Sequence, residues 1–328
     1  MAYVDVRRYI EENPKAIVFI IVGERNCGKT YSTMHLINDI VEDGGDFIYM
    51  RRYLQKELMK SKDSIFNKVE DCNIHCKGNT YVWQNPKSEE DNRKCGYAVA
   101  LTSIPKGIEF DNVKVILFDE FSITDNSRYL PNEFDTFANF IETVIRRRED
   151  IIIIMLGNNK NFYNPYTVGW NINLGEHQKR WTSSNGMVKY FLVSATGKEA
   201  KREETIIGKL FSGTQYDAWA SGEFTENTGI NIEKKPGEAR YWCTIKTDLM
   251  TFTVWVYGNK TWISTSKGEN RAIYNMNKQN VQENEYVFFK QANQIQRIRI
   301  SASKGQLYYE SEKIKSAFQE IINMLLRY

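Results

Sequence analysis

The sequence predicts an α/β fold, with a parallel sheet that carries helices on both faces, and a smaller C-terminal α+β domain. Two apolar runs, 16–22 and 113–118, have the length and residue types of fully buried strands. The first run leads into a glycine-rich turn and a helix-like stretch, and the second ends in two carboxylates. Beyond residue 240, short runs rich in aromatic and β-branched residues are typical of strands. A chain of 328 residues is long enough for about two domains.

The turn after the first apolar run has the pattern G-x-x-x-x-G-K-[ST]. Its residues are Gly23, Glu24, Arg25, Asn26, Cys27, Gly28, Lys29 and Thr30, and a helix-like stretch follows over 31–41. In such a loop, backbone N–H groups and the positive end of the helix bind phosphate oxygens. The lysine reaches the β- and γ-phosphates, and the threonine hydroxyl binds Mg²⁺. A chance lysine in a glycine-rich turn is the alternative, but the flanking strand and helix favour a P-loop that binds ATP and Mg²⁺.

Residues 47–50 are predicted to form a second parallel strand. Arg51 and Arg52 follow it and would lie at the ligand-binding edge of the sheet, or else at a solvated strand end. The lysine-rich stretch that comes next has only a weak helical face. Its Lys56 is a possible DNA contact, and a solvated charged face is the alternative.

Residues 75–83 and 95–101 are predicted to form two strands of a hairpin. Four side chains of metal-binding type fall in or beside them, namely Cys72, His75, Cys76 and Cys95. A zinc site is disfavoured because the second Cys/His pair at metal-ligand spacing is missing. The loop 102–112 that follows carries Lys106, a second possible DNA contact.

The apolar run 113–118 ends in Asp119 and Glu120, about ninety residues after the P-loop, as in a Walker B strand. Asp119 would hold Mg²⁺ through water, and Glu120 would polarise the attacking water as the catalytic carboxylate. With strands intervening between the two motifs, this is the pattern of the additional-strand, catalytic-glutamate (ASCE) type of P-loop NTPase.

Residues 131–149 are predicted to form a helix with one apolar face, which closes in three arginines. Cations at a helix C-terminus complement its dipole, which is the structural alternative. As an arginine finger, Arg146 is our first choice and Arg148 the second. This helix runs antiparallel to its strand, so its end lies away from its own P-loop. The arginine would therefore complete a neighbouring subunit's site, which implies a ring.

Residues 151–156 are predicted to form another buried strand. The polar residue Asn158 follows Gly157 and would sense the γ-phosphate at the strand end. A simple turn is the alternative.

Taken in order, several segments resemble one family, the DNA-packaging ATPases of phi-29-like tailed phages. They are the P-loop, Phe47–Tyr53, Phe118–Phe121, Asn126, Tyr129–Glu133, Arg146, Arg148–Glu149 and Asn164–Tyr166. The resemblance is dense over residues 16–170 and thin afterwards. It implies a homopentameric ring on the portal of an empty capsid, which drives double-stranded DNA inward by ATP hydrolysis. It also implies a trans-acting arginine at Arg146, a C-terminal domain of nuclease-derived fold and, in some members, a packaging RNA.

The C-terminal third is predicted to be a separate domain. We expect a P-loop ATPase domain with a lid segment over 1–197, a connector over 198–230 and an RNase H-like domain over 231–328. The last domain would contain strands at 241–246, 251–257, 262–265 and 306–309 and a closing amphipathic helix over 314–325.

No nuclease activity is expected from this domain. Two-metal nucleases need clustered carboxylates, and the strands 241–246 and 251–257 contain none. Asp248 lies in the turn between them. A basic group near the end, Arg297, Arg299 and Lys304, would grip nucleic-acid phosphates or be a solvated surface.

Composition sets the remaining expectations. A net charge of +3 makes any DNA contact local, and five cysteines with one in the P-loop favour reduced thiols inside a cell. We find no signal peptide or apolar run of membrane-spanning length. The protein is therefore expected in the cytosol. The resemblance further implies a host cell cytoplasm, with the protein transiently on the procapsid portal and absent from the mature virion.

These observations predict an ATP-driven translocase of double-stranded viral DNA. A large terminase would also cut DNA, and a cellular helicase would favour single strands on stacking aromatic residues. A capsid-docked scaffold would bind nucleotide without hydrolysing it.

Overall fold

A computed structural model describes most of the chain, which divides by its contacts into two units. One is Met1–Phe162 with Ile172–Thr225, and the other is Tyr163–Asn171 with Glu226–Tyr328. The described residues are 4–24, 27–52, 62–88, 91–104, 109–122, 129–130, 132–158, 162, 164–172, 174, 178–193 and 231–326. The proposed connector therefore lies outside them. No helix in these ranges is long and apolar enough to cross a membrane.

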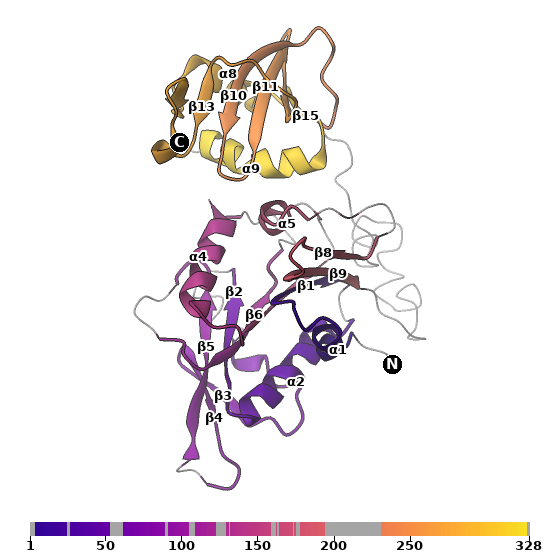
Figure 1. The fold of residues 1–328 in the computed structure, drawn as a ribbon, viewed down its shortest axis with the longest axis vertical. Helices are drawn as coiled ribbons and strands as arrows, with labels where there is room; N and C mark the ends of the chain where they lie inside the picture. Colours follow the sequence, from indigo (N-terminus) through magenta and orange to yellow (C-terminus); the bar gives the residue numbers. More distant parts are fainter. Residues whose placement is uncertain are drawn as a thin grey trace. The chain divides into compact units, whose positions relative to one another are not determined.

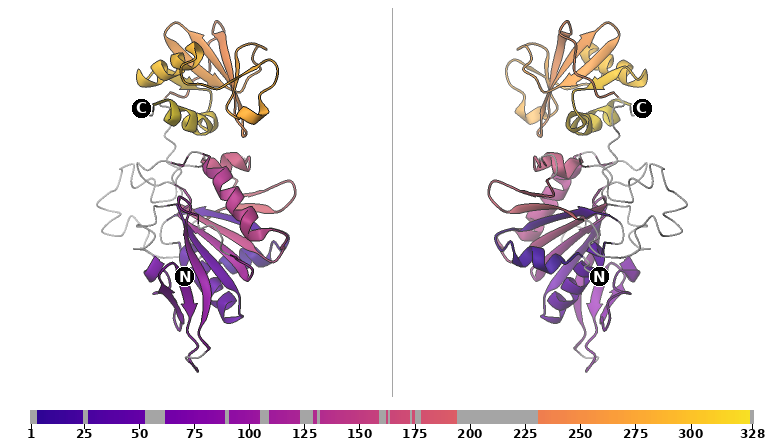
Figure 2. Two further views of the ribbon diagram at one scale, coloured as in Figure 1. Left: turned by 90° about the vertical axis from the view of Figure 1, so that its left-hand side faces the viewer. Right: turned by 90° about the vertical axis from the view of Figure 1, so that its right-hand side faces the viewer.

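In the N-terminal unit, nine described strands form one twisted sheet (Figures 1 and 2). They are β1 (Val18–Gly23), β2 (Asp46–Arg51), β3 (Ile74–Lys77), β4 (Thr80–Trp83), β5 (Arg93–Ala100), β6 (Val113–Asp119), β7 (Ile152–Asn158), β8 (Arg180–Thr182) and β9 (Val188–Val193). The order is β3-β4-β5-β2-β6-β7-β1-β9-β8, with the six strands from β5 to β9 parallel and the outer strands antiparallel. The central strands are continuous apolar runs because both faces of a parallel sheet are covered.

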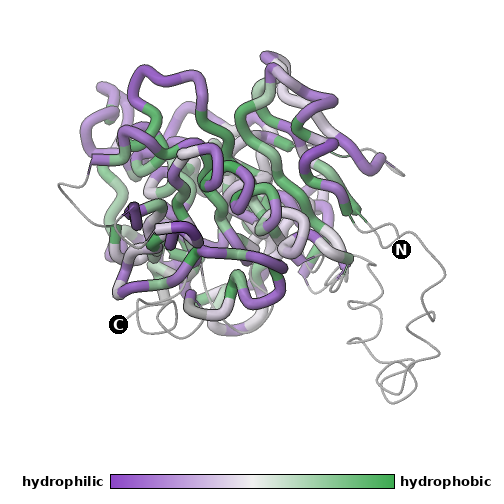
Figure 3. The backbone as a smooth tube through the Cα atoms, turned by 90° about the horizontal axis from the view of Figure 1, so that it is seen from below, coloured by the Kyte–Doolittle hydropathy of each residue, from purple (hydrophilic) through white to green (hydrophobic). Residues whose placement is uncertain are grey.

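Helices cover the two faces of this sheet (Figure 1). The described helices are α1 (Val6–Glu11), α2 (Lys29–Glu42), the short η1 (Lys62–Ser64) and α4 (Glu133–Ile145). Leu117 of β6 belongs to the core cluster under α2, while the next residue, Phe118, stacks on Phe137 of α4 with ring centroids 5.4 Å apart. Successive side chains of a strand point to opposite faces, so β6 contributes to both layers. Figure 3 shows hydrophobic and hydrophilic stretches alternating along the backbone.

The strand order fixes the type of nucleotide-binding fold. β7 lies between β1, which ends at the phosphate loop, and β6, which ends at the two carboxylates. The predicted additional strand between the two motifs is therefore confirmed, as is the α/β fold class. Because β1, β6 and β7 are parallel, their carboxyl ends meet at one edge of the sheet.

The prediction of a single strand over 75–83 was wrong. A turn at Gly78 and Asn79 divides it into β3 and β4, and Gly78 has the positive φ of +66° that favours glycine. The partner strand β5 pairs antiparallel with β4 as predicted, and it also pairs parallel with β2.

The C-terminal unit contains a second sheet of six described strands. They are β10 (Arg240–Lys246), β11 (Thr251–Tyr257), β12 (Lys260–Ser264), β13 (Ile273–Asn275), β14 (Glu285–Val287) and β15 (Leu307–Tyr309), in the order β14-β13-β10-β11-β12-β15. The first three form an antiparallel meander, and β13 runs parallel to β10. This central arrangement is that of the predicted RNase H-like layout. The unit's helices are α5 (Pro165–Gly169), η4 (Lys278–Asn280), α8 (Asn293–Ser303) and α9 (Glu312–Leu326).

Candidate nucleotide site

The phosphate loop joins β1 to α2 at the carboxyl edge of the sheet. Gly28 is the N-cap of α2 with a positive φ of 88°, which glycine adopts without strain. Gly23 lies against β9 so closely that a Cβ there would be 2.0 Å from the Val193 carbonyl oxygen. Glycine is thus required at both ends of the described loop. Arg25 and Asn26 lie outside the described residues, so their predicted phosphate contacts stay predictions.

The Lys29 side chain is buried inside this loop. Its Nζ donates to the carbonyls of Gly23, at 2.9 Å, and Glu24, at 2.6 Å, and lies 3.4 Å from Cys27 Sγ. Cys27 is 1% exposed and donates its Sγ–H to the Glu24 carbonyl. The ammonium is therefore held over the loop at the N-terminal end of α2, where an anion would bind.

Asp119 and Glu120 reach the same edge. Asp119 pairs in register with Leu156, and Gly23 pairs with Asn158, so both carboxylates lie close to the level of the phosphate loop. Glu120 has a φ of 53°, in the region that non-glycine residues rarely adopt. Such strained backbone is concentrated at functional sites, and it agrees with the predicted role of Glu120.

Arg51 connects β2 to this carboxylate pair. Its Nη2 lies 2.6 Å from Glu120 Oε2 and 3.8 Å from Asp119 Oδ2, and Tyr49 donates to Asp119 Oδ2 at 3.4 Å. The pKa of Asp119 is raised to about 6, mainly by burial; the Arg51 charge opposes this rise and the Glu120 charge adds to it. The sequence placed Arg51 at the ligand edge but did not predict that it binds the Glu120 carboxylate.

The residues present fit a magnesium ion. Asp119 is a buried carboxylate whose raised pKa shows that one arginine at 3.8 Å does not compensate its burial. Thr30 is an exposed residue at the start of α2. Carboxylate and hydroxyl oxygens are the hard ligands that Mg²⁺ prefers, and a second cation would favour the ionised form of Asp119.

Asn158 ends β7 opposite Gly23. Its backbone carbonyl accepts from Ser122 Oγ at 3.3 Å, while its half-buried side chain makes no hydrogen bond within the described ranges. The amide is thus available beside the phosphate loop, where the sequence predicted it.

Arg146 and Arg148 lie at the opposite edge of the sheet. α4 ends at Ile145, earlier than predicted, and the Arg148 guanidinium hydrogen-bonds the backbone beside the start of β6. The seven residues of β6 separate this edge from Asp119 by about 20 Å. Arg146 is exposed and its side chain has no partner among the described residues. Of the two predicted finger residues, only Arg146 has an uncommitted guanidinium.

Arg52 performs a different task from its neighbour Arg51. Its Nε and Nη2 bind the two carboxylate oxygens of Glu133 at 2.6 and 2.7 Å, and Glu133 is fully buried. Glu133 also accepts from the Leu130 backbone N–H, and the Arg52 guanidinium lies 4.5 Å from the centre of the Tyr129 ring. Two of the segments that carry the family resemblance, Phe47–Tyr53 and Tyr129–Glu133, are therefore joined by one buried ion pair, which anchors the start of α4.

The other predicted contacts have mixed outcomes. Lys56 and Lys106 lie outside the described residues and remain predictions. Within the described ranges, no three His, Cys, Asp or Glu side chains are grouped as a metal site, and Cys72, Cys76 and Cys95 form no disulfide. In the predicted basic group, Arg297 donates to the Gly258 carbonyl at 2.8 Å.

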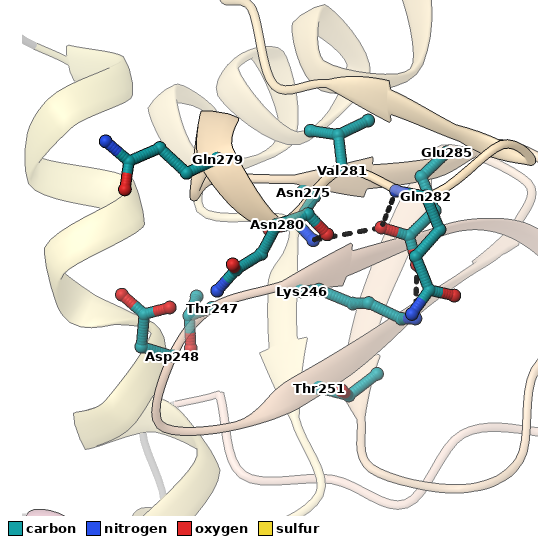
Figure 4. A pocket seen from close by; sticks show the side chains of 10 residues that line it. All are labelled: Lys246, Thr247, Asp248, Thr251, Asn275, Gln279, Asn280, Val281, Gln282 and Glu285. Atoms are coloured by element: carbon teal, nitrogen blue, oxygen red, sulfur yellow. Dashed lines mark hydrogen bonds and ion pairs between the residues drawn. The ribbon is translucent and has the colours of Figure 1, made fainter.

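The C-terminal unit has an open polar pocket of about 680 Å³ at the end of β10 (Figure 4). Lys246 forms an ion pair with Glu285, and Asn275 Nδ2 donates to the same carboxylate at 2.9 Å. The hydrogen bond from Lys246 is the main reason that the pKa of Glu285 is lowered. An ammonium group thus lies beside this carboxylate.

The fold of the N-terminal unit and its nucleotide site, with the phosphate loop and the two carboxylates at one sheet edge, together define a P-loop NTPase of the additional-strand, catalytic-glutamate type. The sequence model of the Podovirus DNA encapsidation protein (Gp16) family matches residues 6–325, and the chain belongs to this family.

Relatives with known names support the assignment. The chain is 25% identical over 319 residues to the DNA packaging protein of Bacillus phage phi29, covering 94% of both chains. It is 29% identical over 252 residues to the DNA packaging protein of Bacillus phage B103, covering 73% of this chain and 74% of the relative.

Solved structures show the same fold. The Phi-28 gp11 DNA packaging motor superposes with a TM-score of 0.72 at 18% identity, covering 99% of this chain and 98% of that one. A chain of the bacteriophage Phi-29 viral genome packaging motor assembly gives 0.67 at 22% identity, covering 99% and 100%. The predicted resemblance is confirmed.

Proposed function

We propose that this chain hydrolyses ATP with Mg²⁺ and uses the energy to move double-stranded viral DNA into a preformed capsid. The observation that carries the proposal is the meeting of the phosphate loop, Asp119 and Glu120 at one sheet edge, with Glu120 held by Arg51 at 2.6 Å. Relatives named as DNA packaging proteins over nearly the whole chain support the DNA-moving role.

In this proposal, each group has one task. Lys29 neutralises the β- and γ-phosphates, and Thr30 with Asp119 would hold Mg²⁺, whose charge stabilises the transferred phosphoryl group. Glu120 orients and polarises the attacking water, for which it must leave the ion pair with Arg51. Asn158 contacts the γ-phosphate and reports its loss.

A ring is part of the proposal. Arg148 ties the end of α4 to the start of β6, about 20 Å along this strand from Asp119, so the adjacent Arg146 is proposed to complete the site of a neighbour. A pentamer seated on the capsid portal, with or without a packaging RNA, suits the family. We place the assembled protein in the host cytoplasm, on the procapsid only during packaging.

The C-terminal unit is proposed to have no nuclease activity. Its pocket pairs Lys246 with Glu285, whereas two-metal cleavage needs several carboxylates free to bind cations. This separates the proposed translocase from a large terminase.

The test is steady-state ATP hydrolysis with and without linear double-stranded DNA, in the wild type and in Glu120→Gln. We expect stimulation by duplex of any sequence, because contacts to the phosphate backbone carry no sequence information. The variant should retain ATP binding and lose turnover. Absence of hydrolysis in the wild type would favour the scaffold, and stimulation by single strands alone would favour the helicase.

A further inference from the structure

The turn after α4 is unusual for a residue as large as arginine. The Arg148 backbone N–H donates to the Ile145 carbonyl at 2.9 Å, which closes a four-residue turn. Arg146 is its first central residue, with φ 51° and ψ −103°, the conformation of a type II′ turn. Glycine is strongly preferred there, because a Cβ strains this backbone. Something must therefore hold Arg146 in a conformation that it does not favour.

The Arg148 side chain stabilises this turn through hydrogen bonds to four backbone carbonyls. Its Nη1 donates to the carbonyls of Asp111 and Val113 at 2.5 and 3.1 Å, and its Nη2 donates to those of Phe110 and Val144 at 2.8 and 2.7 Å. Three of these carbonyls belong to the start of β6 and the loop before it. The fourth belongs to the last turn of α4, where carbonyls lack partners within the helix.

This bonding depends on the shape of the guanidinium. Its planar fork presents five N–H donors in fixed directions, so one group can satisfy four carbonyls from two segments. A lysine ammonium is a point charge with three donors and cannot reproduce this set. The neighbouring Arg147 is exposed and its side chain makes no bond in the described part of the chain, so it is a matched control.

We infer that Arg148 is a positioning residue for the trans-acting Arg146. It ties the end of α4 and the strained turn to the start of β6, so that Arg146 projects from a fixed point toward the neighbouring subunit. The inference rests on the proposed trans role of Arg146. It removes Arg148 from the set of finger residues and gives this arginine a separate task.

The first test is the ATPase rate of Arg148→Lys in rings assembled on capsids with DNA. A displacement of about 1 Å in a catalytic group can cost about 100-fold in rate, so we expect a fall in kcat of that order. The KM for ATP should stay unchanged, because the variant's own phosphate loop is intact. Arg147→Ala should match the wild type. A KM effect without a kcat effect would contradict the inference.

The decisive test mixes subunits. A Glu120→Gln subunit has an inactive site and an intact arginine, whereas Arg148→Lys has an intact site and a misplaced arginine. Mixed rings should therefore recover ATPase activity above either variant alone, as should mixtures of Glu120→Gln with Arg146→Ala. Recovery with Arg146→Ala but not with Arg148→Lys would overturn the inference and leave the trans role standing.

Failure of both mixtures would instead reject the trans role, and the inference with it, while the Glu120 result tests ATP hydrolysis independently. If Arg148→Lys does not fold, Arg148→Gln is the second variant, since its amide can donate to two carbonyls at most and again breaks the set of four bonds. That variant should show a loss of kcat at least as large and the same recovery in mixed rings.

Discussion

Adjacent residues in this protein serve different parts of the molecule, and Arg51 and Arg52 show this most clearly. Arg51 binds the carboxylate pair at the nucleotide edge, whereas Arg52 binds the buried Glu133 at the start of α4. At the other end of α4, Arg148 binds backbone carbonyls, whereas Arg146 is exposed and has no side-chain partner among the described residues. At the residue scale, then, an arginine whose guanidinium is already bonded within the protein has a structural task, and one without such a bond can contact a ligand or another subunit.

Replacement of Arg146 should separate stability from activity. Arg146→Gly relieves a strained backbone at φ 51° and should raise the free energy of unfolding by up to about 1 kcal/mol, or the Tm by about 2 °C. The same variant should lose the trans-acting guanidinium and with it DNA-stimulated turnover. Arg146→Ala is the control, with the same loss of turnover and no gain in stability. Thermal unfolding measures the Tm and an ATPase assay measures the turnover. A lower Tm in Arg146→Gly than in the wild type would contradict backbone strain at this residue.

Asp119 makes the fold sensitive to pH in a predictable direction. Its pKa is about 6 in the folded protein against an ordinary value of 3.8, so the folded state binds this proton more tightly. The ionised carboxylate therefore destabilises the fold above about pH 6, and this effect fades as the pH falls toward 4. Asp119→Asn should raise the free energy of unfolding by up to about 3 kcal/mol at neutral pH and by little near pH 4.

Urea unfolding of the metal-free protein at several pH values measures this difference. Asp150 is a control of opposite sign, because its hydrogen bond from Lys114 lowers its pKa and its contribution is lost as the pH falls. An effect of Asp119→Asn that does not change with pH would contradict the assignment.

At the scale of elements, α4 is anchored at both ends by arginines, and the anchor at its start is buried. Removing one partner of a buried ion pair costs about 3–5 kcal/mol, because the other charge remains without compensation. Glu133→Ala should therefore lower the free energy of unfolding by that amount. Denaturant unfolding checks this. The exposed pair Arg8–Glu12 is the control, and Arg8→Ala should leave the unfolding midpoint unchanged.

The double variant Arg52→Met with Glu133→Leu provides a second check. It removes both charges together and should cost less than the sum of the two single changes. Strict additivity would show that the pair does not act as a unit.

The sequence was sufficient for the elements that obey strong local rules. Apolar runs and motif spacing predicted the buried strands, the phosphate loop and the carboxylate pair. They also predicted that α4 ends at the edge of the sheet away from its own phosphate loop. The sequence could not assign partners to Arg51 and Arg52, because β2 meets β6 and α4 only after folding. β13 and β14 have three residues each, too few for any periodicity, and α8 was missed because its exposed Ile300 blurs the apolar face.

At the scale of the whole molecule, the chain enters the C-terminal unit twice. After β7 and its terminal Asn158, the segment Tyr163–Asn171 joins the C-terminal unit, and the chain returns at Ile172. There α5 packs on α9, its Tyr166 is fully buried, and Lys313 Nζ donates to Asn171 Oδ1 at 2.8 Å. The end of β7 beside the nucleotide site is thus only a few residues away from a helix held by the other unit.

This connection predicts that a change in α5 affects the C-terminal unit. Tyr166→Ala removes a fully buried ring and should destabilise that unit by about 3 kcal/mol. Hydrogen exchange in α9 should become faster, while exchange in β1 and β6 should not. Tyr257→Ala, at an exposed position of β11, is the control and should leave α9 unchanged. Faster exchange confined to the N-terminal unit would show that α5 belongs there.

The measurement that tests the central claim most directly is DNA packaging into empty capsids, scored as DNA protected from added nuclease. With ATP and Mg²⁺, the wild type should protect double-stranded DNA regardless of sequence, and Glu120→Gln should protect none despite binding ATP. Protection by Glu120→Gln, or protection without ATP, would contradict an ATP-driven motor. ATP hydrolysis by the wild type without any protected DNA would leave an ATPase whose work is not packaging.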